Sequence, residues 1–140
     1  ENIHGFDSFE GFPENYNNDR KKGTTSTNGY LPNVPNNVYL YKGWFKNTLA
    51  KFLSSNPLKK SSFIHIDCVL YSSTKEVLLA LRYTIVPGTI IVLDEYYNYS
   101  DWRNYEYKAF HEFVNLYNIS YKYLAYTDQQ VCIEIIDIRN

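Results

Sequence analysis

The stretch "TIIVLDE", residues 89–95, decides the fold class of this 140-residue chain. Its four consecutive aliphatic residues form a run of strand length, and Asp94 and Glu95 follow at once. An apolar run without alternation indicates a strand that is covered on both faces, which is typical of a parallel sheet flanked by helices. The stretch therefore predicts an α/β fold in which one buried strand ends in two acids.

The sequence before this strand has the same succession of strand, acid and helix. "SFIHID", residues 62–67, predicts a strand that ends at Asp67. Ser73 and Glu76 have the spacing of a capping box and predict the start of a helix, which the Pro-Gly pair at 87–88 ends. The buried face of this helix is predicted to hold Val77, Leu78, Leu81 and Ile85.

The first 53 residues predict two strands, a loop and a helix. "NIHGF", residues 2–6, reads as a strand that ends at Asp7, and "NVYLYKG", residues 37–43, reads as another. Residues 8–37 are rich in Asn, Gly, Pro, Thr and Lys and lack an apolar period, so we expect a flexible loop or lid. The helix is predicted from the spacing of Trp44, Phe45, Thr48, Leu49, Phe52 and Leu53.

The C-terminal part predicts a helix and a hairpin. Asp101 is expected to cap a long helix, and "SYKYLAY", residues 120–126, pairs with "QVCIEIIDI", residues 130–138. One face of the helix is predicted to hold Trp102, Tyr105, Ala109, Phe110, Phe113 and Tyr117. The element order predicts one Rossmann-like α/β domain over residues 1–140, with a doubly wound, mostly parallel sheet and a C-terminal antiparallel hairpin.

Composition narrows the classes of protein further. A chain that is 44% hydrophobic and 18% aromatic is globular, and a formal net charge of -1 gives no field to attract nucleic acid or an anionic membrane. The longest wholly apolar run is far too short to span a bilayer. Cys68 and Cys132 lie in apolar, strand-like settings and are predicted to be reduced core thiols, in agreement with a cytoplasmic location.

Three predicted strands end in acids, namely Asp7, Asp67 and the pair Asp94–Glu95. Ligands of open α/β sheets bind beyond the carboxyl ends of the strands, and neighbouring strands lie about 4.8 Å apart. Acids on adjacent strands would therefore share one cation, and carboxylate oxygens suit Mg²⁺ or Ca²⁺ better than zinc. Each acid alone is equally well explained as a helix N-cap or a turn residue, whereas three at one sheet edge favour a site.

The histidines and tyrosines leave alternatives open. His65 alternates with Asp67 along its strand and can reach the site, although a satisfied core histidine is the commoner role. His4 and His111 are interpreted as structural. The cluster "EYYNY", residues 95–99, could stack against a sugar or an aromatic acceptor, and packing is the alternative.

Four blocks of the sequence resemble the macrocin O-methyltransferase family, whose members are S-adenosylmethionine-dependent class I enzymes that methylate sugar hydroxyls. The blocks are "GFDSFEGFPE", "LYKGWFKNTL", "HIDCVLYSSTKEVL" and "VPGTIIVLDEYYNY" with "EYKAFHEF", in order between about Gly5 and Gln130. The resemblance implies methyl transfer to a small-molecule hydroxyl, most often of a sugar, assisted by a divalent metal such as Mg²⁺. It implies metal ligands at Asp67, Asp94 and Glu95, and cofactor contacts at Asp7, Ser8, Phe9, Gly43 and Trp44.

The chain departs from the family pattern in two places. Around the first metal acid the family pattern resembles Asp-x-Asp-Leu-Tyr, and the second Asp of this pattern is the proposed general base in relatives. In this chain Val69 occupies that position. A base would have to be Asp67, a metal-bound water or His65, unless the metal lowers the hydroxyl pKa enough. The glycine-rich turn and first central strand of class I methyltransferases are also missing, so we expect an upstream segment, or another chain such as a second copy, to fill the sheet.

The sequence thus supports two hypotheses of different classes. The first is an S-adenosylmethionine-dependent O-methyltransferase with Asp67 and His65 as catalytic residues, which is favoured by the acids at 67, 94 and 95. The second is a non-catalytic remnant that binds a cation or a sugar, which is favoured by Val69 and the missing turn.

Overall fold

The computed structural model describes residues 1–139, which fall into two compact units divided between Ser55 and Asn56. In the first unit β1 (Ile3–Asp7) and β2 (Val38–Lys42) pair in parallel, with Asp7 opposite Lys42. The helix α1 (Phe45–Ser55) packs on this pair through Phe52, whose ring centroid lies 4.7 Å from that of His4. The order of these elements agrees with the sequence prediction.

Residues 8–37 form a loop without helix or strand, and backbone hydrogen bonds close it on itself. The Phe12 N–H donates to the Thr24 carbonyl at 3.0 Å, and the Gly29 N–H donates to the Phe9 carbonyl at 2.8 Å. Gly11, with φ +75°, is the tightest position, because a Cβ there would lie 2.3 Å from the Thr24 oxygen. The flexibility of the loop at residues 8–37 stays a prediction, but these contacts define the path of its backbone.

The second unit is built on a four-stranded sheet in the order β3-β4-β6-β5. The strands are β3 (Phe63–Ile66), β4 (Ile90–Leu93), β5 (Ile119–Tyr126) and β6 (Val131–Ile138). β3 and β4 are parallel, and the two pairs that involve β6 are antiparallel. This arrangement confirms a mixed α/β fold with a C-terminal hairpin, and it places the last strand of the hairpin inside the sheet.

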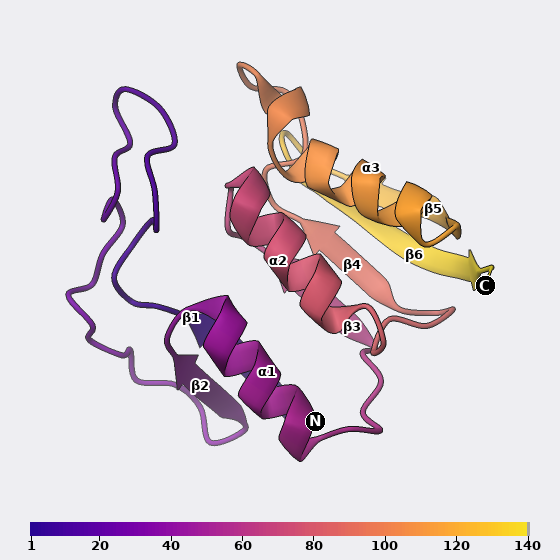
Figure 1. Ribbon diagram of the computed structural model, residues 1–140, viewed down its shortest axis with the longest axis horizontal. Coiled ribbons are helices and arrows are strands. Elements are labelled where there is room, and N and C mark those ends of the chain that lie inside the picture. The colour runs from indigo at the N-terminus through magenta and orange to yellow at the C-terminus, as the bar shows by residue number, and fades with distance from the viewer. Residues whose placement is uncertain (140) are drawn as a thin grey trace. The chain divides into compact units, whose positions relative to one another are not determined.

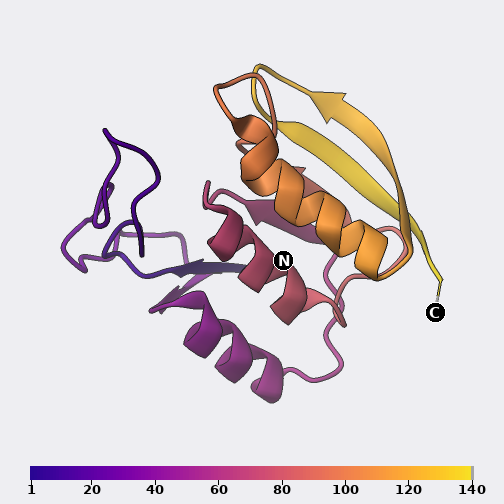
Figure 2. The ribbon, with the colours of Figure 1, turned by 45° about the horizontal axis from the view of Figure 1, so that its top comes forward.

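Two helices cover one face of this sheet. They are α2 (Tyr71–Leu81) and α3 (Glu106–Leu116), and Figures 1 and 2 show them side by side on the same face. Apolar residues between the helices and the sheet form the core, and the most completely buried among them are Leu78, Ile91, Leu93, Phe110, Ile133 and Ile135. The period-2 alternation of β3 leaves His65 exposed, because Ile64 and Ile66 point into this core.

Two predicted helix starts are wrong. α2 begins at Tyr71, with Leu70 as an N-cap that makes no side-chain hydrogen bond. The Leu70 carbonyl already accepts the Thr74 N–H at 2.9 Å, so Ser73 lies inside the first turn and forms no capping box with Glu76.

Asp101 makes no capping hydrogen bond either. It precedes a short 3₁₀ helix, η1 (Trp102–Asn104), and Tyr105, with φ -115° and ψ -124°, separates η1 from α3. Because of this break the predicted long helix is two elements, and α3 begins with the buried Glu106.

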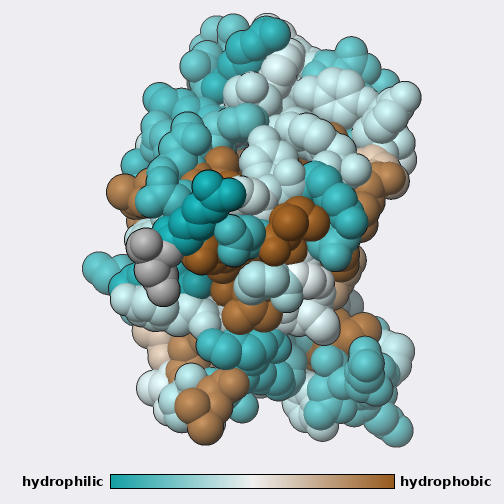
Figure 3. Space-filling model, turned by 90° about the vertical axis from the view of Figure 1, so that its right-hand side faces the viewer, coloured by the Kyte–Doolittle hydropathy of each residue, from teal (hydrophilic) through white to brown (hydrophobic). Residues whose placement is uncertain are grey.

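The surface of the described residues is mixed in character. Leu124 and Ile136 on the hairpin are about half exposed, and Figure 3 shows apolar patches among hydrophilic side chains on the side that it presents.

Both cysteines are free thiols. Among residues 1–139 no helix has the length and apolar character needed to cross a bilayer.

Candidate active site

His65, Asp67 and Asp94 come together where the parallel strands β3 and β4 end. Each offers one ligand atom, and these three atoms lie within 4.8 Å of one another. The register explains the convergence, because Ile66 pairs with Leu93 and the Asp94 N–H donates to the Ile66 carbonyl at 3.0 Å. The strands that precede Asp67 and Asp94 are therefore neighbours, which is the condition for the two acids to share one cation.

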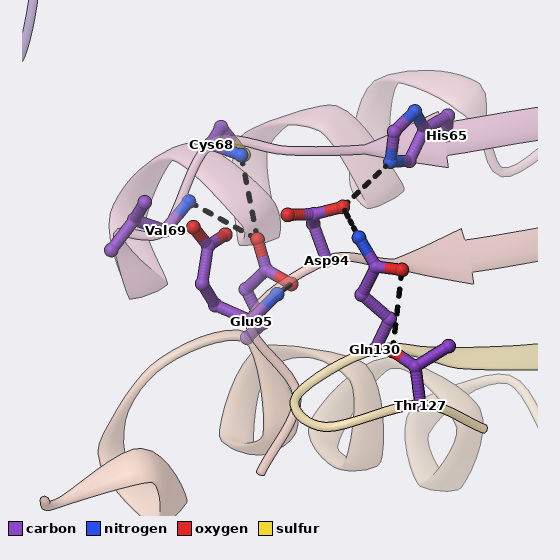
Figure 4. Close-up of polar contacts among 8 residues, drawn as sticks. His65, Cys68, Val69, Asp94, Glu95, Thr127 and Gln130 are labelled. Atoms are coloured by element: carbon purple, nitrogen blue, oxygen red, sulfur yellow. Dashed lines mark hydrogen bonds and ion pairs between the residues drawn. The ribbon is translucent and has the colours of Figure 1, made fainter. Parts of the chain in front are cut away.

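The Asp94 carboxylate is held by two other side chains. Its Oδ1 lies 3.1 Å from Nε2 of His65 and also accepts a hydrogen bond from Nε2 of Gln130, as Figure 4 shows. The Gln130 Oε1 in turn accepts from the Thr127 hydroxyl at 3.3 Å. A carboxylate fixed in this way is oriented for a ligand before the ligand arrives.

Sequence reasoning missed Gln130. It lies just before β6, and its proximity to Asp94 depends on the pairing of Leu93 with Val131. A local sequence pattern carries no signal for this antiparallel pairing, because the two residues are 36 positions apart.

The site is open to solvent. The side chain of His65 is 46% exposed and that of Asp94 is 23% exposed. Beside Asp94 lies a hollow of about 320 Å³, whose other lining residues are Thr127, Asp128, Gln129 and Gln130. A small polar molecule could therefore approach Asp94 from the turn of the hairpin.

Glu95 lies outside the cluster of His65, Asp67 and Asp94. Its backbone N–H donates to Oε2 of Glu106 at 3.0 Å, and its side chain is turned away from His65 in Figure 4. The role of Glu95 as a metal ligand stays a prediction.

Glu106 is a fully buried carboxylate that the sequence analysis did not single out. Its Oε1 accepts the N–H of Val69 at 3.1 Å and that of Cys68 at 3.4 Å, while its Oε2 accepts the N–H of Glu95. Burial raises its pKa to about 8, the negative charge of Glu95 adds to the rise, and the backbone donors oppose it. Sequence reasoning could have found it only as a charged residue at a core-facing position of the helix.

Val69 adopts an unusual backbone conformation beside Glu106. Its φ is +59°, in the left-handed region that a β-branched residue rarely occupies, and its side chain is 6% exposed. Such a conformation costs on the order of 1–3 kcal/mol and persists only where the surroundings enforce it. Val69, at the position where the family resemblance implies an acid, is therefore packed into the core.

The predicted cofactor residues lie in the first unit, where β1 and β2 end. Asp7 Oδ1 accepts the Phe9 N–H at 2.5 Å, and both residues line a hollow of about 390 Å³ with Thr25, Thr27, Tyr30, Leu31 and Pro32. The Gly43 N–H donates to the Asp7 carbonyl at 2.9 Å, Ser8 is buried, and Trp44 directly precedes α1. The five residues therefore gather around the ends of two paired strands.

The remaining histidines and the tyrosine cluster make packing contacts. Nδ1 of His4 lies 3.1 Å from the Tyr41 hydroxyl. The hydroxyl of the buried Tyr96 lies 3.0 Å from Nε2 of His111 and 2.5 Å from the hydroxyl of Tyr123. The two contacts of Tyr96 join the segment after β4 to α3 and to the hairpin.

Residues 1–128 match the family described as macrocin O-methyltransferase (TylF). This chain belongs to the macrocin O-methyltransferase family. The match includes every predicted site residue from Asp7 to Glu95, and it confirms the resemblance seen in the sequence blocks. The chain has no significant match among curated proteins.

Solved methyltransferases share the fold of this family member. The calicheamicin methyltransferase CalS11 superposes with a TM-score of 0.70 at 24% identity, over 96% of this chain and 60% of CalS11. The O-methyltransferase NovP gives a TM-score of 0.70 at 19% identity, over 97% of this chain and 60% of NovP. An O-methyltransferase from Bacillus cereus, solved in complex with SAH, gives a TM-score of 0.50 at 14% identity, over 72% of this chain and 51% of the Bacillus cereus chain. The chain thus spans about 60% of the length of the first two structures.

Proposed function

We propose that this chain belongs to an S-adenosylmethionine-dependent O-methyltransferase that acts on the hydroxyl of a sugar or a related small molecule with the help of a divalent cation. The observation that carries the proposal is the convergence of His65, Asp67 and Asp94 at the ends of β3 and β4, in a macrocin O-methyltransferase family member. Its structural neighbours CalS11 and NovP are methyltransferases, which supports the reaction class.

The donor set of the cluster fits a hard divalent cation. Two carboxylates, one of them already fixed by Gln130 and His65, supply oxygen ligands of the kind that Mg²⁺ and Mn²⁺ take, with water completing the shell. We assign Asp67 and Asp94 as ligands, and Glu95 would join them only if its side chain turned toward Asp94. A bound cation would polarise the acceptor hydroxyl and lower its pKa.

We assign the removal of the proton to His65. Position 69 holds a buried valine, so no acid side chain reaches the site from there. The contact between His65 Nε2 and Asp94 orients the ring as a carboxylate orients other catalytic imidazoles, and it stabilises the positive charge that the ring gains. The other ring nitrogen then accepts the proton of the acceptor.

The polar hollow beside Asp94 suits a sugar. Carboxylate and amide side chains from the hairpin turn, such as Asp128 and Gln129, can hydrogen-bond neighbouring hydroxyls of the acceptor. The cofactor is assigned to the hollow of the first unit, where Asp7 would accept hydrogen bonds from the ribose hydroxyls. The protein's main contribution to the rate would be to orient the methyl donor and the acceptor.

Calorimetry of the full-length protein tests this function. We expect heat on addition of S-adenosylmethionine, and methyl transfer from labelled cofactor to a member of a panel of free and nucleotide-linked sugars once Mg²⁺ is added. Absence of any heat from S-adenosylmethionine would refute the methyltransferase assignment. Heat from Mg²⁺ or a sugar, together with no heat from S-adenosylmethionine, would instead support the non-catalytic binding module.

A further inference from the structure

We propose that Glu106 is a positioning residue that ties together the two segments on which Asp67 and Asp94 lie. The inference concerns a residue of α3 for which the site described above has no chemical role, and its consequence for metal binding rests on the proposed function. Glu106 lies 37 and 11 positions away in the chain from the residues whose N–H groups it accepts, Val69 and Glu95.

The two oxygens of Glu106 divide between the two segments. Oε1 accepts hydrogen bonds from the N–H groups of Cys68 and Val69, which follow Asp67. Oε2 accepts a hydrogen bond from the N–H of Glu95, which directly follows Asp94. These bonds place the carboxyl group of Glu106 between the segments after β3 and β4. A single planar group therefore fixes the distance between the two backbones that carry the acids.

The cost of this arrangement argues against an incidental contact. A carboxylate that is fully buried loses its hydration, and only hydrogen bonds to it compensate for that loss. Val69 is held at φ +59°, a conformation that its side chain disfavours, with its N–H on Oε1. The break between η1 and α3 at Tyr105 brings Glu106 into this position at the first turn of the helix. The chain thus accepts a buried acid, a strained residue and a broken helix at one point.

Glu112 provides a matched control on the same helix. Its carboxylate accepts from the Tyr71 hydroxyl at 2.6 Å and pairs with Lys75 at 3.0 Å, at a side-chain exposure of 41%. It therefore joins α3 to α2 without contacting either acid-bearing segment. Replacement of each glutamate by glutamine removes one carboxyl group from α3 and preserves the size of the side chain.

Hydrogen exchange in the full-length protein without metal is the direct test. In Glu106→Gln the amide nitrogen faces backbone N–H groups instead of accepting from them, so we expect exchange of the amides of residues 68, 69 and 95 to accelerate roughly tenfold or more. Peptides from β6 should keep their protection, and Glu112→Gln should leave residues 68, 69 and 95 unchanged. Equal exchange of these amides in the wild type and Glu106→Gln would overturn the proposal.

A second variant and a second measurement keep the proposal testable if Glu106→Gln does not fold. In that case, Glu106→Asp keeps the carboxyl group on a side chain that is one methylene shorter. We expect this variant to release the Glu95 amide or the 68–69 amides, and retention of all three would overturn the proposal. Mn²⁺ affinity, followed by electron paramagnetic resonance, should fall about 10–100-fold in Glu106→Gln and stay unchanged in Glu112→Gln. A wild type that binds no Mn²⁺ would refute the proposed metal site, while the exchange data would still decide the role of Glu106.

Discussion

The Nε2 atom of His65 lies 3.1 Å from Oδ1 of Asp94, across two neighbouring parallel strands. This contact places an ionisable ring at the group of acids to which the family resemblance assigns a metal. The ring can act there as a proton acceptor or as a ligand, and the two roles differ in what the loss of the ring would change.

Replacement of His65 by glutamine separates these roles. We expect kcat to fall about 10²–10⁴-fold, because the variant cannot take the acceptor proton at neutral pH. The Mn²⁺ affinity should stay within a few-fold of the wild-type value, because Asp67 and Asp94 remain. Steady-state kinetics and a Mn²⁺ titration of the same preparation provide the measurement. A loss of Mn²⁺ affinity that accounts for the whole loss of kcat would make His65 a ligand instead.

Asp94→Asn should weaken Mg²⁺ binding about tenfold or more, because a neutral amide replaces one of two anionic ligands. Asp128→Asn is the matched control: it lines the same hollow, and its Oδ1 accepts from the Asn98 amide at 2.8 Å. Calorimetric titration with Mg²⁺ should distinguish the two variants. Equal Mg²⁺ affinities in Asp94→Asn and the wild type would identify Asp94 as a turn residue.

Two glycines of the loop at 8–37 should respond differently to alanine. Gly11 and Gly23 both have positive φ, but a Cβ on Gly11 would lie 2.3 Å from the Thr24 oxygen, whereas a Cβ on Gly23 meets nothing within 4 Å. We expect Gly23→Ala to cost about 1 kcal/mol of unfolding free energy, from the backbone conformation alone. Gly11→Ala should cost more and should speed proteolysis within the loop. Similar costs for both variants would show that the Phe12–Thr24 contact does not hold the loop in solution.

The titration of His111 should lower the stability of the protein as the pH drops from about 7 to about 5, against the opposite contribution of Glu106, whose raised pKa favours the folded state as the pH falls. Burial lowers its pKa, whereas the unfolded chain takes up a proton near pH 6.5. At this residue the unfolded state therefore binds more protons in this range, and the contribution of His111 to the unfolding free energy falls as the pH falls. The rings that surround His111 are Tyr96, Tyr107, Phe110 and Tyr121.

His111→Gln should remove this contribution, so that the unfolding free energy at pH 5 rises relative to that at pH 7 when compared with the wild type, and denaturant unfolding at pH 5, 6 and 7 measures it. Glutamine can keep a hydrogen bond to the Tyr96 hydroxyl, so the comparison isolates the titration of the ring. An unchanged slope of unfolding free energy against pH in His111→Gln would assign the effect to another group.

The sequence by itself determined the class of fold and placed Asp67 and Asp94 at the carboxyl ends of predicted strands. The apolar run at 89–95 and the strand at 62–67 end in acids, and parallel strands carry such ends to one edge regardless of the rest of the chain. Alternation along β3 also placed His65 and Asp67 on one face, because the side-chain period of a strand is fixed at two. Local patterns suffice for these conclusions.

Only the tertiary structure decided what surrounds the acids. Gln130 reaches Asp94 through the pairing of β4 with β6, and Glu106 reaches the segments after β3 and β4 from a different helix. The predicted caps at Ser73 and Asp101 failed for a related reason, since the helix starts are set by the buried Leu70 and Glu106. Contacts between residues far apart in the chain depend on how the elements pack, and packing free energy overrides the weaker preferences of capping motifs.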